Sequence, residues 1–267
     1  MDLSQLSAAT RAQLIVVGES LADDGVLALL REKTLNHVFS DSEDDILVVT
    51  SGKVRQGDVF GLEKYLAWGA MVHERAVPSY DEKREALLEV AAYATEVGAR
   101  RQVVARIESV TDELLMNALY DAPALHYGVA QRDAQRARAG SHAEREAPAV
   151  LRYACDGRYL GVSVRDGYGE LRKDAILDHV ERARALRGTP QLKPTGGAGL
   201  GLYFVITSVA RFVANVAPGQ LTEVIGLFDI RATGREQDSC ARSLHVFTSP
   251  RIDVDAVHGL TPAGVGE

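Results

Sequence analysis

Apolar side chains recur with helical spacing in two stretches of the chain. Residues 82–97 carry Leu87, Ala91 and Ala94 on one side and charged side chains on the other. Between residues 107 and 118 the apolar positions again recur three or four apart. Because an α-helix repeats every 3.6 residues, both stretches predict amphipathic helices that pack on one side. The apolar positions of the second helix are Ile107, Val110, Leu114 and Ala118.

Short runs rich in β-branched residues predict strands elsewhere. An alternating run at 160–166 predicts a strand that ends in Asp166, and residues 244–248 predict a late strand. Residues 13–17 and 45–50 are typical of buried parallel strands, with a helix predicted over 25–31 between them. Helices mixed with strands indicate an α/β protein.

The same patterns divide the chain into parts. We expect a small α/β segment over residues 1–72, a main domain over 73–249 and a mobile tail over 250–267. The stretch 122–149, rich in Ala, Arg and Gln, is predicted to be an exposed insertion in the main domain. The N-terminal segment is either a separate docking or dimerising module or an extension of the main sheet. It resembles the second half of a response-regulator receiver domain, and it has no phosphoacceptor.

Composition narrows the class of protein. The chain has 267 residues, 46% of them hydrophobic and 25% charged, which suits a globular protein. A net charge of −7 argues against nonspecific nucleic-acid binding. The two cysteines, Cys155 and Cys240, form no metal-binding spacing and suit a reducing compartment. No apolar run approaches the roughly 20 residues of a membrane span, so we expect a cytoplasmic protein.

A glycine cluster is the strongest chemical signal. Residues 196–202 read Gly-Gly-Ala-Gly-Leu-Gly-Leu, and the apolar run 203–209 follows at once. A glycine loop that opens a helix offers backbone N–H groups and room for a polyphosphate. The alternative is a tight turn that allows close helix packing.

Two polar motifs precede this cluster. Glu113 and Asn117 are four residues apart and share one helix face, where their oxygens suit proton transfer and Mg²⁺ binding. Most such pairs simply face solvent. The sequence Asp166-Gly-Tyr-Gly169 places a carboxylate at a strand end, where it can accept a hydrogen bond from an exocyclic amine. The alternative there is a hairpin turn.

Taken in order, these motifs resemble the nucleotide-binding boxes of the GHKL superfamily, which shares the Bergerat ATP-binding fold. The likeness covers roughly residues 80–232 and includes a late strand at 219–227. The resemblance implies an α+β two-layer sandwich that binds ATP and Mg²⁺. Glu113 would be the catalytic base, Asn117 would bind Mg²⁺, and Asp166 with Gly169 and Thr222 would hold the adenine. The phosphates would be held by Gly197, Gly199, Leu200 and Gly201, and residues 170–196 would form a helix and an ATP lid.

The resemblance leaves two functions open. The first is a serine/threonine protein kinase similar to the anti-sigma-factor kinases, acting on a regulatory protein partner. The second is a noncatalytic nucleotide-binding or degenerate adaptor that acts by binding a partner protein. For either function a homodimer is a further alternative. The second is favoured by Asp166-Gly-Tyr-Gly169, one residue shorter than the usual box, and by Asp121, where many relatives carry a basic residue or histidine. His73 resembles a histidine-kinase phosphoacceptor, but the interval to Asp112 is too short for a dimerisation domain, so we expect an ordinary exposed or capping histidine.

Overall fold

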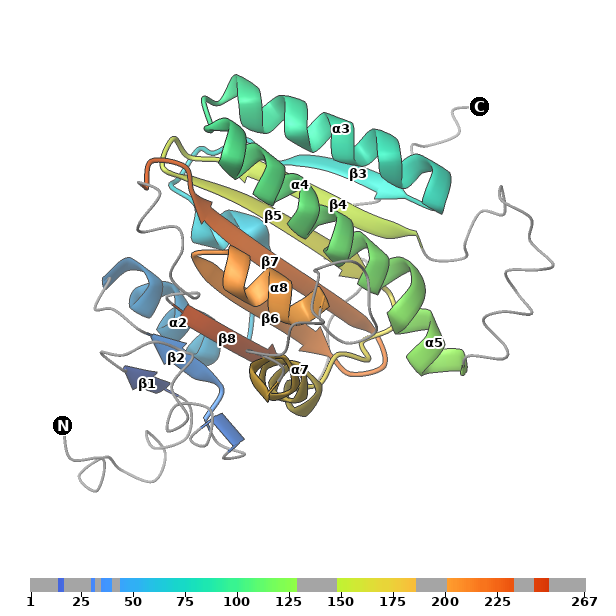
Figure 1. The fold of residues 1–267 in the computed structure, drawn as a ribbon. Coiled ribbons are helices and arrows are strands. Elements are labelled where there is room, and N and C mark those ends of the chain that lie inside the picture. The colour runs from blue at the N-terminus through green and yellow to red at the C-terminus, as the bar shows by residue number, and fades with distance from the viewer. Residues whose placement is uncertain are drawn as a thin grey trace, which may run out of the picture.

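The computed structural model describes residues 14–16, 30–31, 35–39, 44–128, 148–185, 201–232 and 243–249. Within these ranges eight strands form one mixed sheet in the order β1-β2-β8-β6-β7-β5-β4-β3 (Figure 1). Most neighbours are antiparallel, and the pairs β1–β2 and β6–β8 are parallel. The strands are β1 (Leu14–Val16), β2 (His37–Phe39), β3 (His73–Val77), β4 (Ala149–Cys155), β5 (Tyr159–Asp166), β6 (Arg211–Ala217), β7 (Leu221–Asp229) and β8 (Ser243–Thr248).

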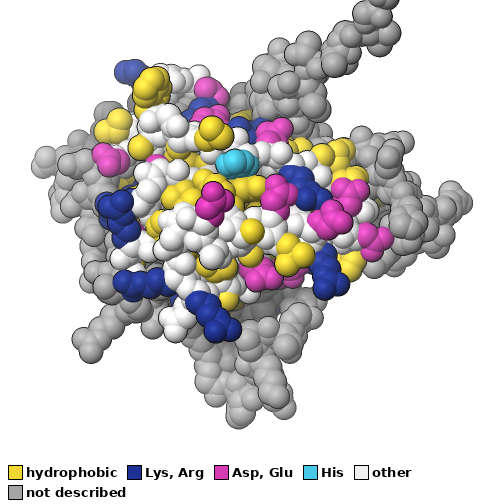
Figure 2. Space-filling model, turned by 90° about the horizontal axis from the view of Figure 1, so that it is seen from above, with side chains coloured by type: hydrophobic (Ala, Val, Ile, Leu, Met, Phe, Trp, Pro, Cys, Tyr) yellow, Lys and Arg dark blue, Asp and Glu magenta, His cyan; other side chains and the backbone are white. Residues whose placement is uncertain are grey.

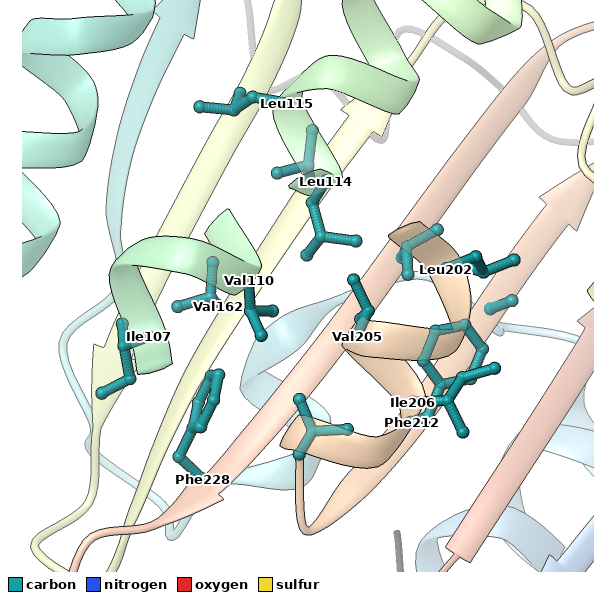
Figure 3. Packing of buried hydrophobic residues seen from close by; sticks show 14 of the residues in the cluster. Ile107, Val110, Leu114, Leu115, Val162, Leu202, Val205, Ile206, Phe212 and Phe228 are labelled. Carbon is teal, nitrogen blue, oxygen red and sulfur yellow. The ribbon is translucent and has the colours of Figure 1, made fainter. Parts of the chain in front are cut away.

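Helices cover one face of this sheet (Figure 1). Among them, α3 (Tyr80–Glu96), α4 (Arg101–Met116) and α8 (Gly201–Ser208) match helices predicted from the sequence, and α7 (Lys173–Ala185) contributes to the same apolar cluster. Side chains of α4 and α8 interlock with apolar residues of β5, β6 and β7 beneath them (Figure 3). This burial is the main favourable term that fixes the helices on the sheet. The packed residues include Ile107, Val110, Leu114, Val162, Leu202, Val205, Phe212 and Phe228.

Helix α2 (Asp44–Gln56) and the 3₁₀ turn η2 (Leu62–Tyr65) contribute to a second apolar cluster, on the other face of the sheet. The prediction of a strand over 45–50 is therefore wrong. Ile46 is 3% exposed and Val48 is 70% exposed, and the buried positions 46, 50 and 53 follow a helical period. A run of β-branched residues can favour a strand locally, but packing on the sheet selects the helix here.

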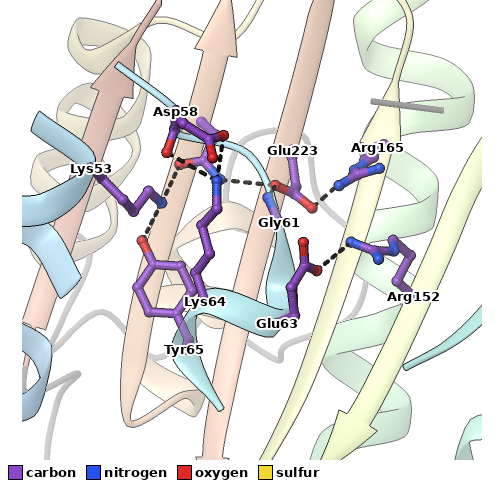
Figure 4. Close-up of polar contacts among 10 residues, drawn as sticks. Lys53, Asp58, Gly61, Glu63, Lys64, Tyr65, Arg152, Arg165 and Glu223 are labelled. Atoms are coloured by element: carbon purple, nitrogen blue, oxygen red, sulfur yellow. Dashed lines mark hydrogen bonds and ion pairs between the residues drawn. The ribbon is translucent and has the colours of Figure 1, made fainter. Parts of the chain in front are cut away.

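A buried polar network joins this second layer to the sheet (Figure 4). Glu223 of β7 is fully buried and pairs with Arg165 of β5 at 2.9 Å. The same carboxylate accepts hydrogen bonds from the Gly61 N–H at 2.8 Å and from Asn215 at 2.9 Å. Lys53 of α2 donates to Asn215 at 3.0 Å and to the hydroxyl of Tyr65. Buried polar groups need such partners, so the network specifies how the segment sits on the sheet.

The predicted α+β sandwich is confirmed. Strand β2 pairs with β8, so the described strands before residue 40 continue the same sheet. The division of the chain at residue 72 stays a prediction, and most of the insertion and all of the tail lie outside the described residues. The face seen from above in Figure 2 mixes acidic, basic and apolar side chains. Among the described helices, none combines the length and apolar character needed to cross a bilayer.

Candidate functional site

Glu113 and Asn117, the polar pair predicted from the sequence, lie at the C-terminal end of α4. Glu113 is half-buried in the last turn of α4, and Asn117 begins a π-helical turn, η3 (Asn117–Asp121). The carbonyl of Asn117 accepts the N–H of Ala122, five residues later, as a π-helix requires. Helix α5 (Ala122–Tyr127) follows directly. Such π-turns occur frequently at functional sites, because they turn side chains away from the regular helical register.

The carboxyl of Glu113 has a raised pKa. Burial is the largest cause, followed by the negative charges of Asp112 and Asp121. Lys83 and His179 oppose the shift, and Lys83 also forms an ion pair with Asp112. A carboxylate with a raised pKa is a better proton acceptor than an ordinary surface carboxylate.

Gly201 brings the glycine cluster to Glu113. A β-carbon on Gly201 would lie 1.5 Å from Oε1 of Glu113, so the carboxylate occupies the space that any side chain would need. Gly201 is the first residue of α8, so Glu113 lies against the start of that helix. Gly197, Gly199 and Leu200 lie outside the described residues. The structure thus places the last glycine of the cluster beside the proposed base.

Asp166 and Thr222 lie directly opposite each other on β5 and β7. Burial raises the pKa of Asp166 to about 6, although N–H groups of Tyr168 and Gly169 and the Thr222 hydroxyl pull it the other way. Oδ1 of Asp166 accepts the Tyr168 N–H at 3.0 Å. Thr222 is 2% exposed, so its hydroxyl lies in the interior beside the Asp166 carboxyl. Register alone therefore unites two residues that are far apart in sequence.

Gly169 is required by the backbone around it. Its φ is +65°, and a β-carbon would lie 2.2 Å from the carbonyl oxygen of Ala217 and 2.7 Å from the Gly219 nitrogen. The chain then continues into α7 (Lys173–Ala185). The hairpin reading of Asp166-Gly-Tyr-Gly169 is therefore wrong, because this loop leads to a helix and not to a neighbouring strand.

An aromatic group beside Asp166 was not identified from the sequence. The rings of His126 and Tyr127, at the end of α5, lie 5.5 Å and 5.9 Å from that of Tyr168. His126 also forms a 2.8 Å hydrogen bond with Glu170. The tyrosine between the two glycines was a signal for this group, but its partners come from 40 residues earlier and only the fold shows them.

His73 lies on a strand and packs against aromatic rings, so it does not cap a helix. It lies half-buried on β3 and stacks on Tyr153, with ring centroids 5.1 Å apart and planes 10° apart. Its ring also contacts that of Tyr93 at 4.9 Å. The expectation of an exposed or capping residue is wrong, because the edge strand and α3 place two tyrosines around the ring. Its place is a packing position.

The candidate residues thus form two groups, Glu113 with Gly201 and Asp166 with Gly169 and Thr222. They are linked through η3, which contacts β5, the strand that ends at Asp166. In the part of the chain that the structure describes, no cluster of three or more His, Cys, Asp or Glu side chains is suited to a metal. A Mg²⁺ ion bound with a nucleotide needs fewer protein ligands, because phosphate oxygens and water complete its shell.

No known protein-family model matches the chain, and no curated protein shows significant sequence similarity. Among solved structures, the chain is similar to one in the SiaB–SiaC complex from Pseudomonas aeruginosa, with 16% sequence identity and a TM-score of 0.36. The alignment covers 69% of this chain and 97% of that one. At this score the likeness carries no functional argument, so function has to be argued from the site.

Proposed function

We propose that this protein is a cytoplasmic ATP-binding signalling regulator of the GHKL type. The observation that carries the proposal is the contact between Glu113 and Gly201, two residues from separate sequence motifs. Asp166 and Thr222, from two further motifs, lie opposite each other at the end of β5. A single nucleotide site requires residues from several elements, since the adenine and the phosphates of one ATP molecule must be held by different parts of the chain.

The chemistry of these residues fits ATP and Mg²⁺. Asp166 and the buried Thr222 hydroxyl opposite it would hold the adenine, with Gly169 beside it. Gly197, Gly199, Leu200 and Gly201 would hold the phosphates, and the Asn117 carboxamide would supply an oxygen to Mg²⁺. Bound Mg-ATP would supply a transferable phosphoryl group with part of its charge neutralised.

In the kinase reading, Glu113 accepts a proton. Its half-buried carboxylate, with a pKa raised by burial, would take the proton from a serine or threonine hydroxyl of a regulatory partner protein. Lys83 keeps Asp112 paired beside it, which limits how far the acidic neighbours raise the pKa of Glu113. The deprotonated hydroxyl oxygen would then bond to the γ-phosphorus of ATP as the bond from that phosphorus to the bridging oxygen breaks, and ADP would leave.

One observation favours a noncatalytic adaptor as the second candidate. Asp112 and Asp121 both add negative charge around Glu113, which disfavours triphosphate beside it. In that case bound nucleotide would switch partner binding on or off, or the pocket would have lost the ability to bind nucleotide. Partner capture, alone or as a homodimer, would then be the activity.

The test begins with calorimetric titration of ATP, with and without Mg²⁺, into the full chain and the Asp166→Asn variant. The proposal expects binding that depends on Asp166 and strengthens with Mg²⁺. No binding at millimolar ATP would overturn it. Phosphate transfer to co-purified proteins then separates the two functions, and Glu113→Gln should lower it by about 10²- to 10⁴-fold without weakening ATP binding. Glu108→Gln, an exposed position on the same helix, is the matched control.

A further inference from the structure

Helix α7 lies between Gly169 and Gly201 along the chain, two glycines of the proposed nucleotide site. It starts four residues after Gly169, and the chain that leaves it reaches Gly201 sixteen residues later. It packs against α8 (Figure 1). The position of α7 therefore constrains the loop that carries Gly169, which leads into the helix, and helix α8, which packs against it.

Arg31 forms ion pairs with two carboxylates on the exposed side of α7. Its guanidinium lies 2.7 Å from Asp178 and 2.7 Å from Oε2 of Glu181, and its Nε donates to Oε1 of Glu181 at 3.1 Å. The Arg31 side chain is 32% exposed, and the two carboxylates are about half exposed. A two-pronged contact of this kind has a defined geometry that a single surface ion pair lacks.

A second contact holds the other end of the helix. Lys173, the first residue of α7, donates to the carbonyl of Leu35 at 2.8 Å and to the side-chain oxygen of Asn36 at 3.2 Å. The carbonyl of Asn36 in turn accepts the N–H of Val246 on β8 at 2.9 Å. Residues 35–36 thus connect α7 to strand β8 of the sheet.

Apolar packing accompanies these polar contacts. Ile176 and Leu177 of α7 are fully buried, and Val180 is 6% exposed. Leu30, next to Arg31, is fully buried in the same cluster. Arg31 therefore contacts the middle turns of α7, and Leu35 and Asn36 contact its first residue. Leu30 belongs to the core that the inner side of α7 helps to form.

We propose that Arg31 is a positioning residue through which the N-terminal segment regulates the nucleotide site by holding α7. The inference rests on the proposed ATP-binding function. When the Arg31 ion pairs are lost, α7 and the loop before it, which carries Gly169, gain conformational freedom, and ATP binding has to remove that freedom again. Release of the segment by a partner would then lower nucleotide affinity.

The test uses the full chain and two measurements on each variant. Amide hydrogen exchange of residues 173–182 without nucleotide measures how firmly the Arg31 ion pairs hold α7. Calorimetry measures the ATP affinity. We expect Arg31→Glu to speed exchange in α7 and weaken ATP binding about three- to tenfold, the scale of two surface ion pairs. Arg31→Lys should lie between this variant and the natural chain. Adding Asp178→Arg and Glu181→Arg to Arg31→Glu reverses all three charges and should restore both values.

Arg75→Glu is the matched control, because Arg75 also bridges two carboxylates, Glu85 and Glu89, on a part of the surface away from α7. Faster α7 exchange with unchanged ATP affinity would overturn the inference and leave Arg31 a structural residue. An equal loss of affinity in Arg75→Glu would also overturn it, as a general charge effect. A natural chain that binds no ATP would overturn the proposed function instead. Hydrogen exchange without nucleotide would in that case still show whether the Arg31 ion pairs hold α7.

Discussion

The substitution Asp166→Asn should stabilise the protein while it abolishes ATP binding at the proposed nucleotide site. Asp166 is 9% exposed, and burial raises its pKa from 3.8 to about 6. At neutral pH the native chain therefore holds a carboxylate that would be more favourable in the unfolded chain. Asparagine has nearly the same shape, keeps an oxygen that can accept the Tyr168 N–H, and carries no charge.

The magnitude follows from the pKa gap. From 3.8 to about 6 is about two units. Each unit corresponds to about 1.4 kcal/mol, so the charged carboxylate lowers the free energy of unfolding by up to about 3 kcal/mol at neutral pH. Because the folded pKa is the higher one, the contribution of the protonated carboxyl is fully present below about pH 4 and is lost as the pH rises through about 6. The advantage of Asp166→Asn should therefore grow over this interval and then level off.

Urea unfolding of both proteins between about pH 4 and pH 8 measures this difference directly. Asp156→Asn is a control of opposite sign. Burial raises the pKa of Asp156, but the N–H groups of Tyr159, Arg158 and Ala67 together hold it below its ordinary value. Neutralising that carboxylate should cost stability at neutral pH. ATP titration of the same samples should show that Asp166→Asn has lost binding.

A stability difference between Asp166→Asn and the natural chain that does not change with pH would refute this reasoning. It would mean that Asp166 ionises in the fold as readily as in the unfolded chain. A loss of stability at neutral pH would refute it as well, because the charged form would then make favourable interactions in the native state. Retained ATP binding by the variant would separately remove Asp166 from the proposed adenine site.

Two further predictions concern the packing of the site and of the second layer. Gly169→Ala should cost at least about 2 kcal/mol more than Gly219→Ala in chemical denaturation, because both have positive φ but a β-carbon clashes with the Ala217 backbone only at Gly169. Equal losses would contradict the packing described for this loop. Glu223→Ala should cost about 3–5 kcal/mol, since it leaves Arg165 buried without its carboxylate. Glu63→Ala, at a partly exposed pair in the same region, should cost less than about 1 kcal/mol, and similar thermal shifts for the two would argue against a buried network.

Local pattern was sufficient where an element follows one clear period. Helices α3 and α4, strand β5 and strand β8 lie where the sequence predicts them, because burial of one face repeats along each segment. The helix α8 after the glycine cluster was likewise expected. Residues 45–50 failed this test, since a short β-branched run suits a strand and a buried helix equally and the sheet face decided between them.

The residue types of the candidate site were also visible in the sequence, but their arrangement was not. Glu113 and Asn117 share a helix face through a spacing of four, which is local information. The contact of Glu113 with Gly201 joins positions 88 residues apart, and no pattern along the chain encodes it. The π-turn that begins at Asn117 was not predicted either, because its energy depends on packing around the helix.

The sequence by itself therefore determined the elements that follow one clear period, such as α3, α4 and β5, and the chemical groups that they carry, because both depend on near neighbours. Tertiary structure decided which groups meet. Strand register placed Asp166 opposite Thr222, and the pairing of β2 with β8 accompanies the contacts of Arg31, Leu35 and Asn36 with α7. These contacts join residues 56 to 208 positions apart, and their stability comes from burial and pairing that exist only once the sheet has formed.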